Sequence, residues 1–142
     1  MPFISITRLR VRSWRYLPSF FVQAFRSARQ AKLSAGNLGV SVLRENANIF
    51  WTRTVWGSEE SMKDYMLAGV HRNVMRRLLE WCDEAAVAHW TQESPQPPSW
   101  QEAHKQLQRT GRPSKVNHPS DAHRQHQIPE PHGTQGKELR WK

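Results

Sequence analysis

The sequence contains a single cysteine, Cys82, among 142 residues. One cysteine can form neither an intramolecular disulfide nor a multi-cysteine metal site, so neither is expected to hold the fold together. Long apolar runs are also missing, since no stretch approaches the roughly 18 apolar residues that span a bilayer. The first residues lack a continuous apolar segment before their arginines, so no secretory signal is predicted. These absences predict a cytoplasmic protein without a membrane span.

Acidic residues are absent from the first 44 positions, and the whole chain carries a formal net charge of +9. The same stretch contains eight basic residues: Arg8, Arg10, Arg12, Arg15, Arg26, Arg29, Lys32 and Arg44. Such an excess favours anionic partners and nonspecific nucleic-acid binding at low salt. A basic surface that is simply solvated has the same composition.

Apolar side chains are few in the last third of the chain. Residues 93–142 contain seven of the nine prolines and five of the seven histidines. This composition buries too little apolar surface to offset the entropy lost on ordering the chain. We therefore expect a domain over residues 1–92 and a Pro- and His-rich C-terminal extension over residues 93–142.

One short helix is predicted within the extension, near residues 99–110. Ser99 and Glu102 form a capping box, and Gly111 is a typical stop. An apolar stripe (Trp100, Ala103, Leu107) predicts that this helix docks on the domain or on a partner subunit. His123 and His126 are three residues apart, but no helix is predicted around them, so no metal site is expected.

The hydrophobic periodicity of residues 2–92 predicts four strands and two helical regions. The expected strands are residues 2–12, 38–45, 49–56 and 85–92, and the expected helices are 17–37 and 58–84, the latter interrupted at Ala68-Gly69. The order βαββαβ is typical of a ferredoxin-like α+β sandwich with an antiparallel sheet. Its helices cover one sheet face and leave the other bare. Because the third strand is apolar or aromatic on both faces, a second copy is expected to cover the bare face in a homodimer.

Three consecutive motifs carry a resemblance: "FWTRTVW", then "SEESMKDYM", then "GVHRNVM". Together with the βαββαβ order, they resemble the dimeric α/β-barrel superfamily over about residues 2–92. Within it, the chain is similar to the antibiotic-biosynthesis-monooxygenase-like proteins and to the spheroidene monooxygenase family. The resemblance implies a sheet that dimerises, a pocket between sheet and helices, and in some members oxygenation of small apolar or aromatic substrates. Some family members use no cofactor, others use haem, and others have no demonstrated activity, so the fold does not define the chemistry.

His71 follows the helix break and is the predicted catalytic residue. Its imidazole could act as a base toward a phenol-like substrate or as an axial ligand to haem iron. Alternatively, it hydrogen-bonds backbone groups that the break leaves unpaired. Met75, four residues later, shares its helix face and lines the same pocket or belongs to the core. Arg72 binds a carboxylate or propionate, or faces solvent.

Aromatic and basic side chains of the third strand complete the predicted ligand site. Trp51 and Trp56 are large planar groups that line an aromatic pocket or only pack in the core. Arg53 shares a face with Trp51 and is either a rim residue or an anchor for a charged ligand group. His89, in the last strand, is interpreted as structural.

Two other classes of function compete with an enzyme. RNA-recognition motifs share the βαββαβ order, but "NIFWTRTVW" lacks the glycines and the aromatic spacing of their third strand, so no specific nucleic-acid binding is predicted. A non-catalytic protein that binds a small ligand or haem has the same fold. No Ser-His-Asp order, phosphate loop or paired-carboxylate spacing is present to favour another reaction.

Overall fold

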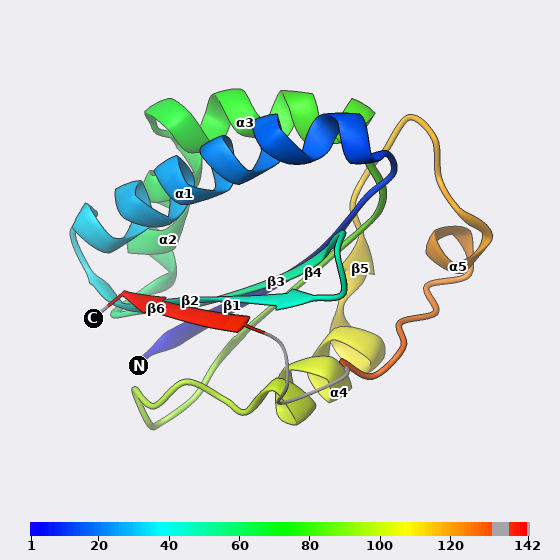
Figure 1. The fold of residues 1–142 in the computed structure, drawn as a ribbon. Helices are drawn as coiled ribbons and strands as arrows, with labels where there is room; N and C mark the ends of the chain where they lie inside the picture. Colours follow the sequence, from blue (N-terminus) through cyan, green and yellow to red (C-terminus); the bar gives the residue numbers. More distant parts are fainter. Residues whose placement is uncertain (132–136, 142) are drawn as a thin grey trace.

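The structure, a computed structural model, describes residues 1–131 and 137–141, with the backbone alone for residues 69–72 and 137–141. The strands are β1 (Phe3–Val11), β2 (Asn37–Glu45), β3 (Ile49–Trp56), β4 (Cys82–Thr91), β5 (Arg112–Pro113) and β6 (Lys137–Trp141). The helices are the short 3-10 turn η1 (Trp14–Tyr16), α1 (Leu17–Leu33), α2 (Glu59–Leu67), α3 (Gly69–Trp81), α4 (Trp100–Thr110) and α5 (Asp121–Arg124). Figure 1 shows α1, α2 and α3 over one face of the sheet and α4 on the other side.

The sheet has the strand order β5-β4-β1-β3-β2-β6, and every neighbouring pair is antiparallel. β1 lies near the centre, where it pairs with both β3 and β4. This is the ferredoxin-like α+β arrangement that the sequence predicts, extended by one strand at each edge. The two edge strands come from the last third of the chain and were not predicted.

The two faces of β1 bury different side chains, as the sequence alternation predicts. Phe3 packs with residues of α1 and α2 on the helix side, whereas Ile4 and Ile6 belong to a cluster on the opposite side. β3 divides in the same way: Phe50 faces the helices, and Trp51 faces away from them. The sheet therefore has an apolar layer on both of its faces.

The helix break is confirmed at Ala68, whose backbone is extended (φ −98°, ψ 141°) between α2 and α3. Ser58 caps α2 by accepting a hydrogen bond from the Ser61 amide at 3.2 Å. The expected end of α3 near Glu84 is wrong, because the helix ends at Trp81 and β4 begins at Cys82. Pairing with β1 draws these residues into the sheet, since Cys82 lies opposite Val11 in the ladder.

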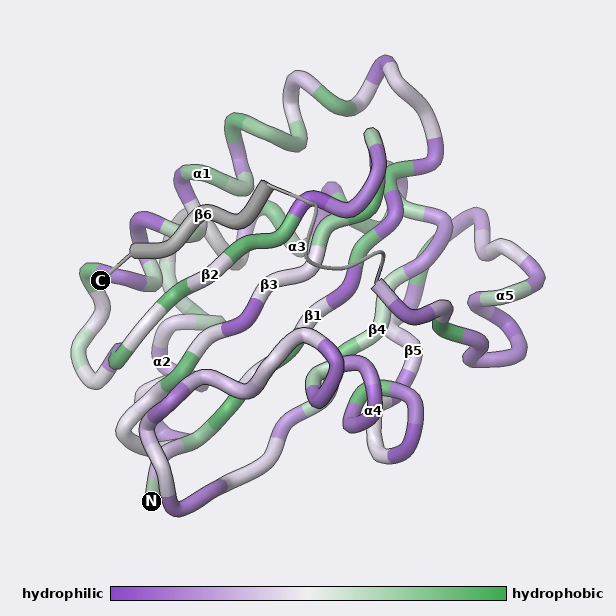
Figure 2. Tube along the Cα trace, turned by 60° about the horizontal axis from the view of Figure 1, so that its bottom comes forward, coloured by the Kyte–Doolittle hydropathy of each residue, from purple (hydrophilic) through white to green (hydrophobic). Residues whose placement is uncertain are grey.

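The second sheet face is not bare, so that expectation is wrong. Ala103 and Leu107 of α4 are fully buried against Ile4, Ile6 and their neighbours, and Ile128 joins the same cluster. Figure 2 brings this side forward and shows α4 beside β4. The chain's own residues after position 92 thus cover the face for which a second copy was expected. A partner is not required for this purpose, and the homodimer stays a prediction.

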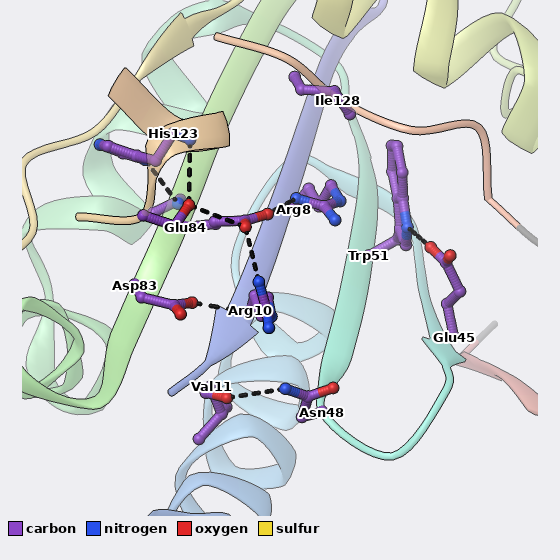
Figure 3. Close-up of polar contacts among 12 residues, drawn as sticks. Arg8, Arg10, Val11, Glu45, Asn48, Trp51, Asp83, Glu84, His123 and Ile128 are labelled. Atoms are coloured by element: carbon purple, nitrogen blue, oxygen red, sulfur yellow. Dashed lines mark hydrogen bonds and ion pairs between the residues drawn. The ribbon is translucent and has the colours of Figure 1, made fainter. Parts of the chain in front are cut away.

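Polar contacts fasten the segment after α4 to β4. Glu84 accepts hydrogen bonds from Arg8 Nη1 at 2.7 Å, Arg10 Nη1 at 2.9 Å and the Ser120 hydroxyl at 2.9 Å. Close by, the Ala85 amide donates to His123 Nδ1 at 3.2 Å. Figure 3 shows Arg8 and Arg10 reaching Glu84 from the neighbouring strand. Burial alone would raise the pKa of Glu84, but these donors hold it below its ordinary value.

Candidate functional site

A cavity of about 450 Å³ lies between the sheet and the helix layer. Its apolar lining consists of Leu9, Met62, Met66, Met75, Leu78, Leu79, Ala85, Val87, Pro113 and Val116. Its polar lining consists of Ser5, Thr7, Thr52, Thr54, Tyr65, His89, Arg112, Ser114 and Lys115. This volume falls within the roughly 300–1,000 Å³ of typical small-molecule sites.

The cavity exists because the helix-facing side chains at the middle of the sheet are small. In the ladder, Ser5 of β1 lies between Thr54 of β3 and His89 of β4. The next row places Thr7 between Thr52 and Val87. Larger residues at the two ends of the sheet form separate apolar clusters around Phe50 and around Trp56. The space between these clusters is left without bulky side chains, and hydroxyl groups line its floor.

Methionines form part of the roof over this floor. Met62 and Met66 come from α2, and Met75 comes from α3. Their unbranched thioethers adapt to ligands of different shape, as methionine-rich binding surfaces do. The lining therefore suits a small apolar or aromatic molecule.

Among the described residues that line this cavity, His89 is the histidine. Its ring lies 5.5 Å from the Phe3 ring, and its buried Nε2 has no hydrogen-bond partner among the described residues. Burial lowers the pKa of His89, and the nearby charge of Arg112 lowers it further. The imidazole is consequently neutral at neutral pH, and one of its ring nitrogens can accept a proton.

Tyr65 supplies a phenol to the same cavity. Its hydroxyl donates to the Ser27 carbonyl at 3.1 Å, and its ring lies 5.2 Å from the Trp56 ring. Burial raises the pKa of Tyr65 well above its ordinary range. The hydroxyl therefore stays protonated and acts as a hydrogen-bond donor rather than as a base.

The extension closes one edge of the cavity. β5 pairs with β4 so that Arg112 lies opposite Val87, and the Ser114 amide donates to the Ala85 carbonyl at 2.8 Å. This pairing brings Arg112, Ser114 and Lys115 to the cavity wall. Two cationic side chains thus stand beside a mainly apolar space.

The predicted site residues are not brought together. Met75 lines the cavity. Trp56 does not line it but packs against Tyr65, which does. Trp51 lies on the opposite sheet face, where its Nε1 donates to Glu45 Oε1 at 2.8 Å. The side chains of His71 and Arg72 lie outside the described residues, so their roles stay predictions.

Arg53 also lies on the face opposite the cavity. It donates to the Pro98 carbonyl at 2.6 Å and to the Ser41 hydroxyl at 3.1 Å, and its guanidinium carbon is 4.2 Å from the centre of the Trp100 ring. These contacts tie the start of α4 to the sheet. Arg53 therefore does not line the cavity. Its role in ligand binding stays a prediction.

Sequence reasoning missed His89, Arg112 and Lys115 as site residues. A signal was present in the strands, because serine and threonine occupy helix-facing positions where a closed core would carry larger aliphatic residues. No comparable signal marked Arg112 and Lys115. They reach the cavity wall because β5 pairs with β4, and a strand of two residues is too short for a sequence pattern to predict. Among the described residues, no group of three or more His, Cys, Asp or Glu side chains is arranged to hold a metal ion.

The sheet and its helices define a ferredoxin-like α+β fold. The chain belongs to the DUF3291 family, a domain of unknown function, whose model matches residues 20–117. No curated protein matches the chain. No helix in the described part of the chain is long and apolar enough to cross a bilayer.

Solved structures share the fold at low sequence identity. Rv0793 from Mycobacterium tuberculosis superposes with a TM-score of 0.59 at 13% identity, covering 66% of this chain and 97% of its own. A candidate antibiotic biosynthesis monooxygenase from Nitrosomonas europaea gives 0.57 at 12% identity, covering 66% and 92%. SnoaB, a cofactor-independent oxygenase from Streptomyces nogalater, gives 0.53 at 15% identity, covering 66% and 94%. About a third of this chain therefore has no counterpart in these neighbours.

Proposed function

We propose that the cavity binds a small apolar or aromatic substrate and that His89 acts as the base in its oxygenation. The observation that carries this proposal is a half-buried histidine, neutral at neutral pH, that lines a cavity of about 450 Å³. A base needs a free nitrogen lone pair within reach of the substrate. The monooxygenase-like fold, found also in an oxygenase described as cofactor-independent, supports the same reading.

The proposed reaction is the oxygenation of an activated methylene or phenol. His89 removes a proton from an activated methylene or phenol, and the resulting anion is electron-rich enough to react with molecular oxygen. For a methylene flanked by aromatic rings, one oxygen atom enters the substrate as a carbonyl group. The two hydrogens of the methylene leave with the other oxygen atom as water, so atoms and electrons balance. The hydroxyls of Ser5 and Thr7 line the cavity and are the groups that would donate to an oxyanion.

The alternative is a non-catalytic protein that binds a small ligand or haem. His89 and Met75 line the cavity and are residue types that hold haem iron, and the cations Arg112 and Lys115 suit propionates. Haem would supply a redox-active iron. The predicted axial ligand His71 has its side chain outside the described residues. An absorption spectrum of the protein titrated with haemin separates this alternative, because axial ligation produces a sharp Soret band.

A homodimer is a separate part of the proposal. In a dimeric α/β barrel, the sheet face opposite the helices meets the sheet of the partner, whereas here Leu107 and Ile128 occupy that face. A dimer of the complete chain is therefore expected to use another surface. The cytoplasmic location predicted from the sequence also remains part of this proposal.

Oxygen uptake tests the proposed reaction. With anthrone as the activated substrate, the native chain is expected to consume oxygen faster than the buffer, and His89→Gln to lose about 10²-fold or more of this rate. His118→Gln is the matched control, because His118 is exposed and contacts Glu80 rather than the cavity. Uptake that is equal in the native chain and His89→Gln would remove His89 as the base. Binding without uptake above the buffer rate would favour the non-catalytic alternative.

A further inference from the structure

Two cationic side chains, Arg112 and Lys115, lie at the cavity edge. Neither side chain makes a hydrogen bond or ion pair with another described residue, and both residues are exposed. Three arginines elsewhere in the chain are ion-paired: Arg8 and Arg10 with Glu84, and Arg12 with Glu80. The cavity wall formed by the extension therefore carries two positive charges that no described acidic residue neutralises.

We propose that this cavity selects anionic amphiphiles: small molecules with an aromatic or alkyl body and a carboxylate or similar anion bound by Arg112 and Lys115. The proposal rests on the cavity of the proposed function and names its ligand class. Arg112 and Lys115 are assigned as specificity-determining residues. The sequence instead suggested Arg53 or Arg72 as the anchor for a charged group.

The strand pairing supports this assignment of Arg112. β5 fixes Arg112 opposite Val87, and Val87 is two residues from His89 on the same face of β4. The guanidinium is near enough to His89 to lower its pKa. An anion held by Arg112 would therefore lie beside the row of the sheet that contains His89. Guanidinium groups pair with planar carboxylates in a bidentate geometry, which fixes orientation as well as position.

The acidic residues nearby do not remove this preference. Glu59 also acts electrostatically on His89, but its carboxylate pairs with Lys63 at 3.3 Å. The described lining of the cavity contains no aspartate or glutamate. An anionic head group thus meets cations and the Ser114 hydroxyl at the edge, while its apolar body meets the methionines of the roof.

A pair of fluorescent probes with related ring systems tests the charge preference. N-phenyl-1-naphthylamine is neutral, and 1-anilinonaphthalene-8-sulfonate carries the same rings with an added sulfonate. We expect the anionic probe to bind more tightly and its affinity to fall as salt rises, while the neutral probe is unaffected by salt. Arg112→Gln is expected to raise the Kd of the anionic probe about five- to tenfold and to leave that of the neutral probe unchanged, with Lys115→Gln giving a smaller change.

Controls place the probes in the cavity and separate the two proposals. Arg109→Gln removes an exposed arginine at the end of α4 that does not line the cavity, and it should change neither Kd. Thr52→Leu narrows the cavity and should weaken the binding of both probes. If circular dichroism shows that this variant does not fold, Thr7→Leu replaces it. Neutral-probe binding without any preference for the anion, or an Arg112→Gln variant equal to the native chain, would overturn the anion preference alone. Failure of both probes to bind the native chain would overturn the cavity of the proposed function as well.

Discussion

Arg8 of β1 and Glu84 of β4 form a buried ion pair, with Nη1 and Oε1 separated by 2.7 Å and both side chains less than a tenth exposed. The pair lies where the sheet meets the segment that follows α4, and Ser120 of that segment donates to the same carboxylate. It therefore joins two strands of the central sheet to the cover of its second face.

Removing one partner of this pair is expected to destabilise the fold strongly, because the other charge is left buried. Glu84→Gln should lower the free energy of unfolding by about 3 kcal/mol or more. Glu59→Gln breaks an exposed pair with Lys63 and should cost less than about 0.5 kcal/mol. Urea denaturation of both variants measures the difference, and equal midpoints would contradict the structural role of Glu84.

The same carboxylate predicts a dependence of stability on acid. The pKa of Glu84 is lower in the folded chain than its ordinary value. Its contribution is therefore complete above about pH 4.3, the ordinary value, and is lost as the pH falls through the folded pKa. Denaturation midpoints measured between pH 6 and pH 3 should fall more steeply for the native chain than for Glu84→Gln.

His89 gives a second dependence at a higher pH. Burial lowers its pKa in the folded chain, so its contribution to stability is complete above about pH 6.5 and is lost as the pH falls below this value. Between pH 8 and pH 5, the native chain should lose more stability than His89→Gln. His123 also has a pKa lowered by burial, but it is present in both proteins and cancels in the comparison. Identical pH profiles would show that His89 is not held neutral by the fold.

Cys82 is expected to be chemically inert in the folded chain. It is fully buried, and burial raises the pKa of its thiol to about 12. Because the thiolate is the reactive form, labelling by a thiol-specific disulfide reagent at pH 8 should be slow in buffer and fast in denaturant. Rapid labelling in buffer would indicate that β4 opens locally near its first residue.

Loosening α4 should expose the second face of the sheet. Leu107→Asp places a charge in a fully buried position, whereas Lys105→Asp changes an exposed residue of the same helix. We expect Leu107→Asp to increase the sedimenting mass above that of the native chain, because the uncovered apolar face then pairs with another copy. Lys105→Asp should sediment like the native chain. An unchanged mass for a folded Leu107→Asp variant would contradict the covering role of α4.

Local signals in the sequence predicted most of the first 92 residues. Alternation predicted apolar or aromatic residues on both faces of the third strand, as Phe50 and Trp51 confirm, and the predicted cap at Ser99 is present. These features depend on the spacing of neighbouring residues, so the sequence displays them directly. The helix end near Trp81 was misjudged because sheet pairing overrides the helical pattern of the following residues.

Contacts between segments that are distant in the sequence could not be predicted from such local patterns. Ile128 is surrounded by proline and polar residues, yet it is buried because the chain returns to the sheet after α4. Arg112 reaches the cavity through two residues of strand pairing, which no periodicity can reveal. His89 was interpreted as structural because it lies within a predicted strand, between Ala88 and Trp90.

The cover supplied by residues after position 92 has a consequence for how the chain acquires its fold. β1 is synthesised well before its partner β4, which ends at Thr91. Ile128, which packs with Ile4 and Leu107 on the second sheet face, follows later still. Contacts over such separations form late, and apolar strands remain unprotected in the meantime. A nascent chain that has reached Thr91 holds every strand of the βαββαβ order while one face of its sheet is still open. The residues after position 92 thus protect the apolar second face of the sheet from aggregation. Chains released before these residues are made are expected to precipitate.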